Sequence, residues 1–262
     1  IGVNYNLPLS TAVVDEIVIT SGALKMLTEK TPILSFVHSN YFPLSYYIYI
    51  PFLTVYVFYL KLFSPFDTFA KIKELGILHT GNFLIVGRMI SVLLGTASVF
   101  LVYLIAQKLF KDKKTSLISS LLFALSPLNV AMSHFARIWT IQIFFILLAT
   151  CFALKIFSEN ALKADWRKFI LLGLLLGAAF AANVVGLLVY IPTMVLVYFS
   201  FESDQMKNFL NFLRTKKFFV LNMTVFLIIA LTYFLNKTSF VNFLNGFLGN
   251  VVHGDNFFKV SF

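Results

Sequence analysis

The stretch that decides the fold is FLIVGRMISVLLGTASVFLVYLIAQ, residues 83–107, which is followed at once by the basic run KLFKDKK, residues 108–114. An apolar run of this length exceeds the roughly 20 residues that cross a bilayer as a helix. Lysines beside the end of such a run are typical of a loop on the cytoplasmic side. The segment therefore predicts a transmembrane helix that runs towards the cytoplasm.

The whole chain has the composition of a membrane protein. Of its 262 residues, 59% are hydrophobic and 12% are charged, and its mean hydropathy is +0.87. Soluble domains carry about 25% charged residues, so we expect an all-α polytopic membrane protein. The net charge of +10 comes without any motif that reads RNA or DNA, so no nucleic-acid partner is predicted. The single cysteine, Cys151, excludes a disulfide within the chain.

Apolar runs and basic loops alternate from residue 83 onward. We predict spans at 83–107, 115–132, 140–157, 169–182, 186–200 and 218–235. The stretch 169–200 is too long for one upright helix and is interrupted by the small polar break AANVVG, residues 181–186. If 169–200 is a hairpin, the basic loops Lys108–Lys114, Lys155–Lys168 and Lys207–Lys217 all lie on one side of the membrane. The spans then form one helical module that ends near residue 236.

Residues 1–82 are predicted to form an outer loop with helices at the membrane surface. Residues 15–30 have the pattern of a surface helix, and 43–63 is aromatic and apolar with Pro51 inside. We prefer 43–63 as a kinked interfacial helix, because a crossing there would put Asp15 on the side of the basic loops. Lys61, Lys71 and Lys73 favour the opposite choice, a crossing that ends in a cytoplasmic loop.

Both ends of the sequence indicate a piece of a longer protein. The chain opens with Ile1 and shows no signal peptide, so we expect one N-terminal span to be missing. Residues 237–262 are interpreted as the start of a truncated outer loop.

Asp15 and Glu16 are the adjacent pair of acids at the start of the surface helix. A carboxylate at a membrane surface can serve as a general base for an acceptor group, or it can bind a cation. It can also cap a helix and complement the helix dipole, which is a structural role. We therefore treat both acids as candidate catalytic residues. A divalent metal remains possible, and no metal ligands are assigned.

The other candidate groups gather on the predicted outer face. Arg137 can bind a phosphate through paired hydrogen bonds, or it can extend to lipid headgroups. His134 shares a side with Arg137 if the turn between them is helical. Asn183 can bond a phosphate or sugar oxygen, or join two helices. His38, Asn40 and Tyr41 are candidates for the acceptor or sugar cleft, and His253 and Asp255 are weaker candidates on the same face.

Three stretches resemble the GT-C superfamily of membrane glycosyltransferases, and most closely the branch that holds protein O-mannosyltransferases and the lipid A aminoarabinose transferase. Asp15-Glu16 is similar to the Asp-Glu of the first outer loop. YFPLSYY, residues 41–47, is similar to a Pro-Pro-Leu-Tyr-Tyr region. GRMIS at 87–91, ALSP at 124–127 and SHFARIW at 133–139 resemble an Arg-Leu-Ser…Leu-Ser-Pro…Ala-Arg-x-Tyr pattern.

The resemblance implies an enzyme that moves a sugar from a polyprenyl-phosphate donor on the extracytoplasmic side. It implies that Asp15 is the catalytic base and that Arg137, with His134 and Asn183, lies near the donor phosphate. The chain departs from the pattern at Phe42, where the family has the first proline, and at Asn183, where many members have Lys or His. The sugar and the acceptor, whether protein, lipid or glycan, are left open.

Two other classes of protein fit a basic, apolar chain. A transporter is expected to place polar groups along a path near the middle of the membrane, whereas these groups concentrate at one end. A non-catalytic assembly subunit predicts that Asp15 and Arg137 tolerate replacement.

Overall fold

The computed structural model describes residues 14–29, 44–65, 68–78, 80–158, 161–201 and 205–235. These residues form helices and their connections, with no strand among them. The elements, in chain order, are α1 (Val14–Glu29), α2 (Leu44–Phe63), α3 (Phe69–Leu78), α4 (Thr80–Phe110), α5 (Lys113–Leu125), α6 (Pro127–Ser133), α7 (Ile138–Ser158), α8 (Trp166–Ala182), the 3-10 helix η2 (Val184–Val189), α9 (Tyr190–Phe199), α10 (Gln205–Leu213) and α11 (Lys216–Leu235).

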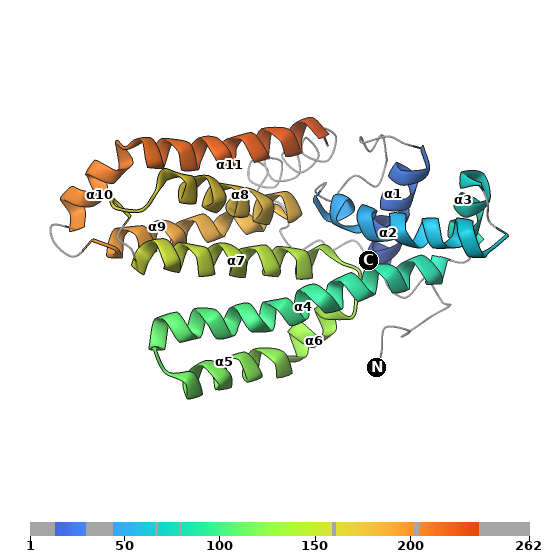
Figure 1. The fold of residues 1–262 in the computed structure, drawn as a ribbon, viewed down its shortest axis with the longest axis horizontal. Coiled ribbons are helices and arrows are strands. Elements are labelled where there is room, and N and C mark those ends of the chain that lie inside the picture. Colours follow the sequence, from blue (N-terminus) through green and yellow to red (C-terminus); the bar gives the residue numbers. More distant parts are fainter. Residues whose placement is uncertain are drawn as a thin grey trace, which may run out of the picture.

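The long helix α4 organises the bundle. Its 31 residues make it about 46 Å long at 1.5 Å per residue. Helices α5 and α7 pack along it, and α8 packs between α7 and α11. The helices α4, α5, α7, α8 and α11 run along the long axis of the molecule in Figure 1. The helix α1 runs across that axis, beside the N-terminal part of α4.

The helix pair with the most extensive contact, α8 with α11, meets at glycines. A Cβ atom built on Gly173 would lie 2.8 Å from Cβ of Thr224, and one on Gly177 would lie 2.6 Å from Cβ of Ile228. Two small residues four apart let helix backbones approach closely, which is a common way for helices to associate inside a membrane. The spacing Gly173-x-x-x-Gly177 therefore fixes how these two helices pack.

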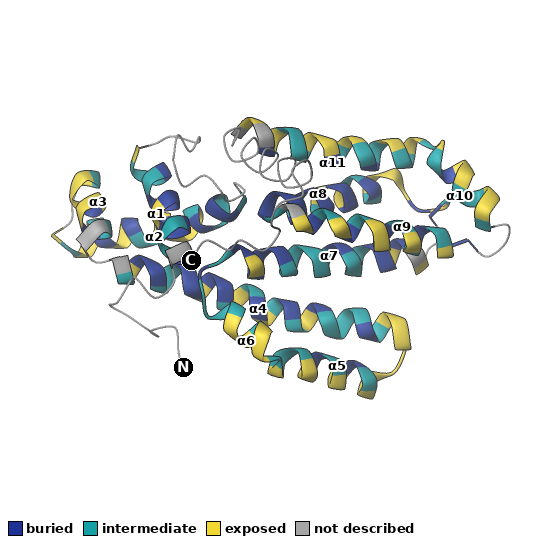
Figure 2. Ribbon diagram, turned by 180° about the vertical axis from the view of Figure 1, so that it is seen from behind, coloured by how far each residue is buried: buried dark blue, intermediate teal, exposed yellow. Residues whose placement is uncertain are grey.

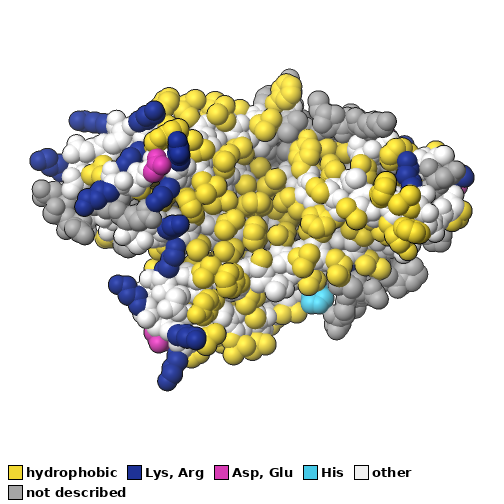
Figure 3. All heavy atoms as spheres, in the orientation of Figure 1, with side chains coloured by type: hydrophobic (Ala, Val, Ile, Leu, Met, Phe, Trp, Pro, Cys, Tyr) yellow, Lys and Arg dark blue, Asp and Glu magenta, His cyan; other side chains and the backbone are white. Residues whose placement is uncertain are grey.

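The surface is apolar around the middle of the bundle, as in Figure 3. Large exposed side chains include Leu93, Phe100, Leu122 and Phe226, each at least 59% exposed. Figure 2 shows that exposed residues follow the outer sides of α5, α9 and α11. Leu44–Phe63, Gly81–Phe110 and Ile138–Ile156 are long and apolar enough to cross a membrane, and two bent pairs bring the number of candidate spans to at most five. The expected fold class, an all-α polytopic membrane protein, is confirmed.

Two predicted spans contain breaks. The segment 115–132 consists of α5 and α6, which meet at Ser126-Pro127 with a bend of 60°. The stretch 169–200 breaks at Asn183, whose backbone is extended, and continues as η2 and α9. Pro127 at the first position of α6 suits a helix start, since its missing N–H needs no partner there. Whether each helix crosses a bilayer remains a prediction.

The basic segments gather at one end of the bundle. The α4–α5, α7–α8 and α9–α11 connections lie together at the left in Figure 1, and Lys and Arg side chains crowd the same end in Figure 3. The prediction that residues 169–200 form a hairpin requires the three basic segments to lie at the same end. One part of the prediction is wrong: the third basic segment is not only a loop, because residues 205–213 form α10.

The opposite end holds α1, α2 and α3. In Figure 1, α2 extends beyond the end of the bundle at which α7 begins. Lys61 lies over the ring of Phe69 at 3.8 Å, and Lys73 pairs with Glu29 at 2.9 Å. These lysines therefore have partners at the end opposite the three basic segments. The length and composition of α2 permit a span, so its interfacial position remains a prediction.

Candidate functional site

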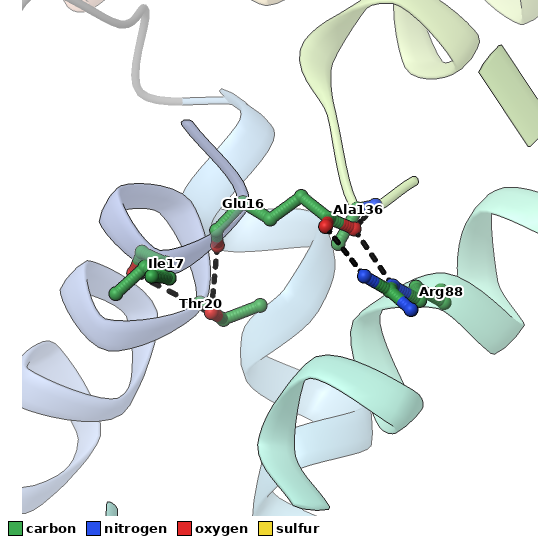
Figure 4. Close-up of polar contacts among 5 residues, drawn as sticks. All are labelled: Glu16, Ile17, Thr20, Arg88 and Ala136. Atoms are coloured by element: carbon green, nitrogen blue, oxygen red, sulfur yellow. Dashed lines mark hydrogen bonds and ion pairs between the residues drawn. The ribbon is translucent and has the colours of Figure 1, made fainter. Parts of the chain in front are cut away.

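A buried ion pair joins the start of α1 to α4. One carboxylate oxygen of Glu16 accepts a hydrogen bond from Nε of Arg88 at 2.9 Å, and the other accepts from an Nη atom of Arg88 at 2.7 Å. The side chains are 1% and 3% exposed. The first oxygen also accepts from the backbone N–H of Ala136 at 2.7 Å. Figure 4 shows the carboxylate between the helix α4 and the turn that precedes α7.

This arrangement pairs two buried charges with each other. Arg88 lies within an apolar helix, where an isolated charge is costly. A planar guanidinium matches a carboxylate through two parallel hydrogen bonds, so each group satisfies the other. The backbone N–H of Ala136 adds a third hydrogen bond. Because the three partners come from α1, α4 and the α6–α7 turn, the ion pair holds these segments together.

Close packing around Gly87 supports the ion pair. A Cβ atom built on Gly87 would lie 2.8 Å from Cβ of Ala136 and 2.9 Å from a methyl carbon of Thr20. Tyr49 of α2 is buried against the same region, and its hydroxyl is 3.4 Å from the Ser91 hydroxyl. A side chain at position 87 would separate the elements that carry Glu16 and Ala136, so glycine is needed there for steric reasons.

The ion pair brings two of the predicted site segments together. Asp15 precedes Glu16 in the first turn of α1, and Arg137 follows Ala136 in the turn before α7. Asp15 and Arg137 thus each neighbour a residue of the hydrogen bond between Glu16 and Ala136. The structure describes the backbone of Asp15 and leaves its side chain outside the described part of the chain.

An aromatic ring lies close to both arginines. The Phe135 ring centroid is 5.8 Å from the central guanidinium carbon of Arg88 and 6.0 Å from that of Arg137. At these distances the ring face attracts a cation weakly. Arg137 is half-buried, and its backbone N–H donates to the Phe135 carbonyl at 2.8 Å. The turn therefore places two guanidinium groups near one ring, and Glu16 balances the charge of Arg88.

His134 faces a different part of the bundle. Its Nδ1 is 2.6 Å from the Val130 carbonyl oxygen, so this nitrogen carries the proton and donates. His134 lines a pocket of about 350 Å³ with Gly95, Thr96 and Asn129, between α4, α5 and α6. The backbone from Phe135 to Arg137 is not helical. The condition for His134 and Arg137 to share a helical side is therefore not met.

Asn183 forms the break between α8 and η2. Its side-chain oxygen accepts from the Val185 N–H at 3.1 Å, which caps η2. The preceding residue, Ala182, is fully buried in the same hydrophobic cluster as Tyr49 and Ala136. Asn183 therefore lies at the end of the bundle that holds the ion pair, with its side-chain oxygen already used as a cap.

The remaining candidates lie outside the described residues. These are His38, Asn40 and Tyr41, together with His253 and Asp255. Among the residues that the structure describes, no group of three His, Cys, Asp or Glu side chains can hold a metal ion.

Arg88 is the residue that sequence reasoning did not assign to the site. The signal was present, because Arg88 is the one charged residue within the run 83–107. An ionisable group in such a run implies a buried partner. Its partner Glu16 lies 72 residues earlier in the sequence, so the pairing could not be read from local spacing.

One comparison with known proteins identifies a family. Residues 33–245 match the family model described as dolichyl-phosphate-mannose-protein mannosyltransferase. The match includes Arg88, Arg137 and Asn183, and it begins after α1. No curated protein and no solved structure matches the chain. Since the match covers most of the 262 residues, the chain belongs to the dolichyl-phosphate-mannose-protein mannosyltransferase family.

Proposed function

We propose that this chain is the part of a membrane mannosyltransferase that holds its reaction centre. The donor is a polyprenyl-phosphate mannose of the dolichyl type, and the acceptor is a protein hydroxyl. The family match over residues 33–245 carries this proposal. The junction of Glu16, Arg88 and Ala136 supports its location, since it joins distant segments at one end of the bundle.

In this proposal Asp15 is the general base. The acceptor oxygen attacks the anomeric carbon of the sugar, and its proton passes to the Asp15 carboxylate. The bond between that carbon and the phosphate oxygen breaks, and polyprenyl phosphate leaves with the electron pair. A single direct displacement inverts the configuration at the sugar carbon. Asp15 is suited to this role because its neighbour Glu16 is fixed in the ion pair.

Arg137 stabilises the leaving phosphate in the same proposal. Negative charge grows on the phosphate as the bond breaks, and a nearby guanidinium stabilises that charge most in the transition state. Glu16 and Arg88 act as positioning residues, because their charges already satisfy each other.

Asn183 and His134 are assigned smaller parts. The Asn183 amide nitrogen can donate to a phosphate or sugar oxygen, while its oxygen caps η2. Because Nδ1 of His134 donates to Val130, its Nε2 can donate to phosphate only when the ring is doubly protonated. His38, Asn40 and Tyr41 are proposed to shape the cleft for sugar and acceptor.

The test of this proposal is transfer by the reconstituted protein, with dolichyl-phosphate mannose as donor and a peptide as acceptor. We expect Arg137→Ala to lower kcat about 10²- to 10³-fold, as for loss of one transition-state donor. Arg137→Lys should retain part of the activity, since lysine keeps the charge but not the paired geometry. Arg214→Ala, at the opposite end, is the control. Equal turnover of Arg137→Ala and wild type would exclude the role of Arg137.

The proposed site faces the extracytoplasmic side, because the basic segments gather at the other end. Single cysteines placed in a Cys151→Ala background test this orientation. We expect an impermeant maleimide to label Thr68→Cys in intact cells and to label Lys113→Cys only after the membrane is opened. Both positions are exposed in the folded protein. The reverse pattern would place the reaction centre on the cytoplasmic side.

A further inference from the structure

The end of the bundle opposite the ion pair is strongly basic. Its Lys and Arg residues come from six helices and their connections: Lys108, Lys111, Lys113, Lys114, Lys155, Lys163, Arg167, Lys168, Lys207, Arg214, Lys216 and Lys217. The acids among the described residues of these segments are Asp112 and Asp165. The ion pairs between described residues involve Glu16 and Glu29, which lie at the other end.

Both of the aspartates that the structure describes at this end are used as helix caps. Asp112 accepts from the backbone N–H of Thr115 at 2.8 Å and from its hydroxyl at 2.6 Å. The hydrogen bond from the Thr115 hydroxyl is the main cause that lowers the pKa of Asp112. Asp165 accepts from the backbone N–H of Arg167 at 3.2 Å. These carboxylates therefore cap the starts of α5 and α8. The described residues of this end carry a large excess of positive charge.

The basic end directly borders the apolar band of the bundle, as Figure 3 shows. Trp166 at the start of α8 is 40% exposed, and Phe219 near the start of α11 is 63% exposed. Tryptophan beside an apolar surface is typical of the headgroup level of a membrane. The charges of this end therefore lie where lipid headgroups would be.

The helix α10 has the form of a helix that lies in the membrane surface. Met206 and Leu210, one turn apart, are 60% and 49% exposed, while the exposed Lys207 and Asn211 lie about 100° further round the helix. Phe212 is fully buried and fixes the helix, with its ring centroid 5.5 Å from that of Phe169. The axis bends by 57° between α10 and α11. An amphipathic helix with lysine on its polar face binds membranes that carry negative charge.

One lysine of this end lies over the ring of a tryptophan. Nζ of Lys216, at the start of α11, lies 5.1 Å from the ring centroid of Trp166. The neighbouring Lys217 instead donates to the backbone carbonyl of Leu162 and ties α11 to the α7–α8 connection. Lys216 is exposed, so its ammonium group can contact both the ring and a headgroup phosphate.

We propose that this end of the bundle binds anionic phospholipid headgroups, with Lys216 above Trp166 as the central contact. The apolar band fixes the depth of the bundle, α10 rests in the headgroup layer, and the lysines attract negatively charged lipids. Each Lys or Arg near such a surface contributes about 1 kcal/mol, which is about fivefold in affinity. This inference is independent of the donor and acceptor of the proposed reaction.

Quenching of Trp166 by brominated lipids tests the proposal. A Trp139→Phe variant leaves Trp166 as the single tryptophan, since the chain has two. The protein is reconstituted in phosphatidylcholine bilayers that contain either brominated phosphatidylglycerol or brominated phosphatidylcholine. We expect quenching of Trp166 fluorescence to show that the protein binds phosphatidylglycerol at least about fivefold more tightly than phosphatidylcholine. We expect this preference to fall as salt is added.

The Lys216→Gln substitution should reduce the preference about fivefold. The matched control is Lys61→Gln, which removes a lysine that also lies over a ring, at the other end; its preference should be unchanged. Equal quenching by the two lipids, or a preference that Lys216→Gln leaves intact, overturns the proposal. If Trp139→Phe does not fold, native mass spectrometry of lipids retained by wild type and Lys216→Gln gives the same comparison.

Discussion

The Asp15→Asn protein is expected to fold normally and to lose mannose transfer. Asparagine has nearly the same shape as aspartate but cannot accept the proton of the acceptor hydroxyl. Loss of a general base lowers the rate about 10²- to 10⁴-fold. The Glu16–Arg88 ion pair is unchanged by this substitution, so α1 should remain docked on α4. The measurement is kcat with dolichyl-phosphate mannose as donor, at saturating acceptor.

The control for Asp15→Asn is Asp112→Asn. Asp112 caps α5 at the basic end, and asparagine is an equally good helix cap, so transfer should continue at the wild-type rate. Asp15→Glu keeps a carboxylate but displaces it by one methylene, and it should retain a small part of the activity. Wild-type turnover by Asp15→Asn would remove Asp15 from the mechanism, whereas Arg137 would still be tested by its own variants.

Local sequence patterns were sufficient to predict most of the helices. The hydrophobic run 83–107 lies within α4, 140–157 lies within α7 and 218–235 lies within α11. These segments are long and continuous, so the need to satisfy backbone hydrogen bonds in an apolar environment makes helices the expected result. Asn183, with small residues beside it, marked the break between α8 and η2, because its short polar side chain can cap the next helix.

Short elements were harder to predict. The helix α10 has nine residues and follows the polar segment 202–204. The lysines and arginine of this region therefore predicted a loop and not a helix. Its helical form depends on Phe212, which packs against Phe169 and Phe218 from other helices. The 60° bend between α5 and α6 also could not be predicted from Pro127 alone, because a proline indicates where a helix starts and not the direction of its axis.

The candidate site was predictable in its segments and not in its contacts. The sequence drew attention to Asp15-Glu16 and to Arg137, and the structure places their segments together through the hydrogen bond of Glu16 to Ala136. It could not distinguish the roles of the two acids, because adjacent residues on a helix point in different directions. Arg88 could not be assigned to the site from the sequence, because nothing in the local sequence identifies Glu16 as its partner.

Breaking the Glu16–Arg88 ion pair should destabilise the protein more than any other single change considered. Glu16→Ala removes the carboxylate that pairs with the buried Arg88 guanidinium, and Arg88→Ala removes the guanidinium that pairs with the buried carboxylate. Removal of one member of a buried pair costs about 3–5 kcal/mol. The measurement is unfolding in detergent, followed by reaction of a thiol-specific dye with Cys151, the one cysteine of the chain.

An exposed ion pair on the same helix supplies the control. Glu29 of α1 pairs with Lys73 of α3 at 2.9 Å, with side chains that are 36% and 50% exposed. Water screens such a pair, so Lys73→Ala should leave the unfolding temperature almost unchanged. A loss of stability as large as that of Glu16→Ala would show that docking of α1 depends on surface charge and not on the buried pair.

Replacing both members of the buried pair separates stability from positioning. The double variant Glu16→Leu with Arg88→Met removes both charges and keeps side chains of similar volume. Apolar replacements of buried ion pairs are often neutral or stabilising, so the double variant should be more stable than either single variant. The hydrogen bond from the Ala136 N–H to the carboxylate is lost in this variant. If Glu16 positions the segment that carries Arg137, mannose transfer should therefore remain low although the fold is restored. Full recovery of transfer together with stability would reduce the ion pair to a purely structural role.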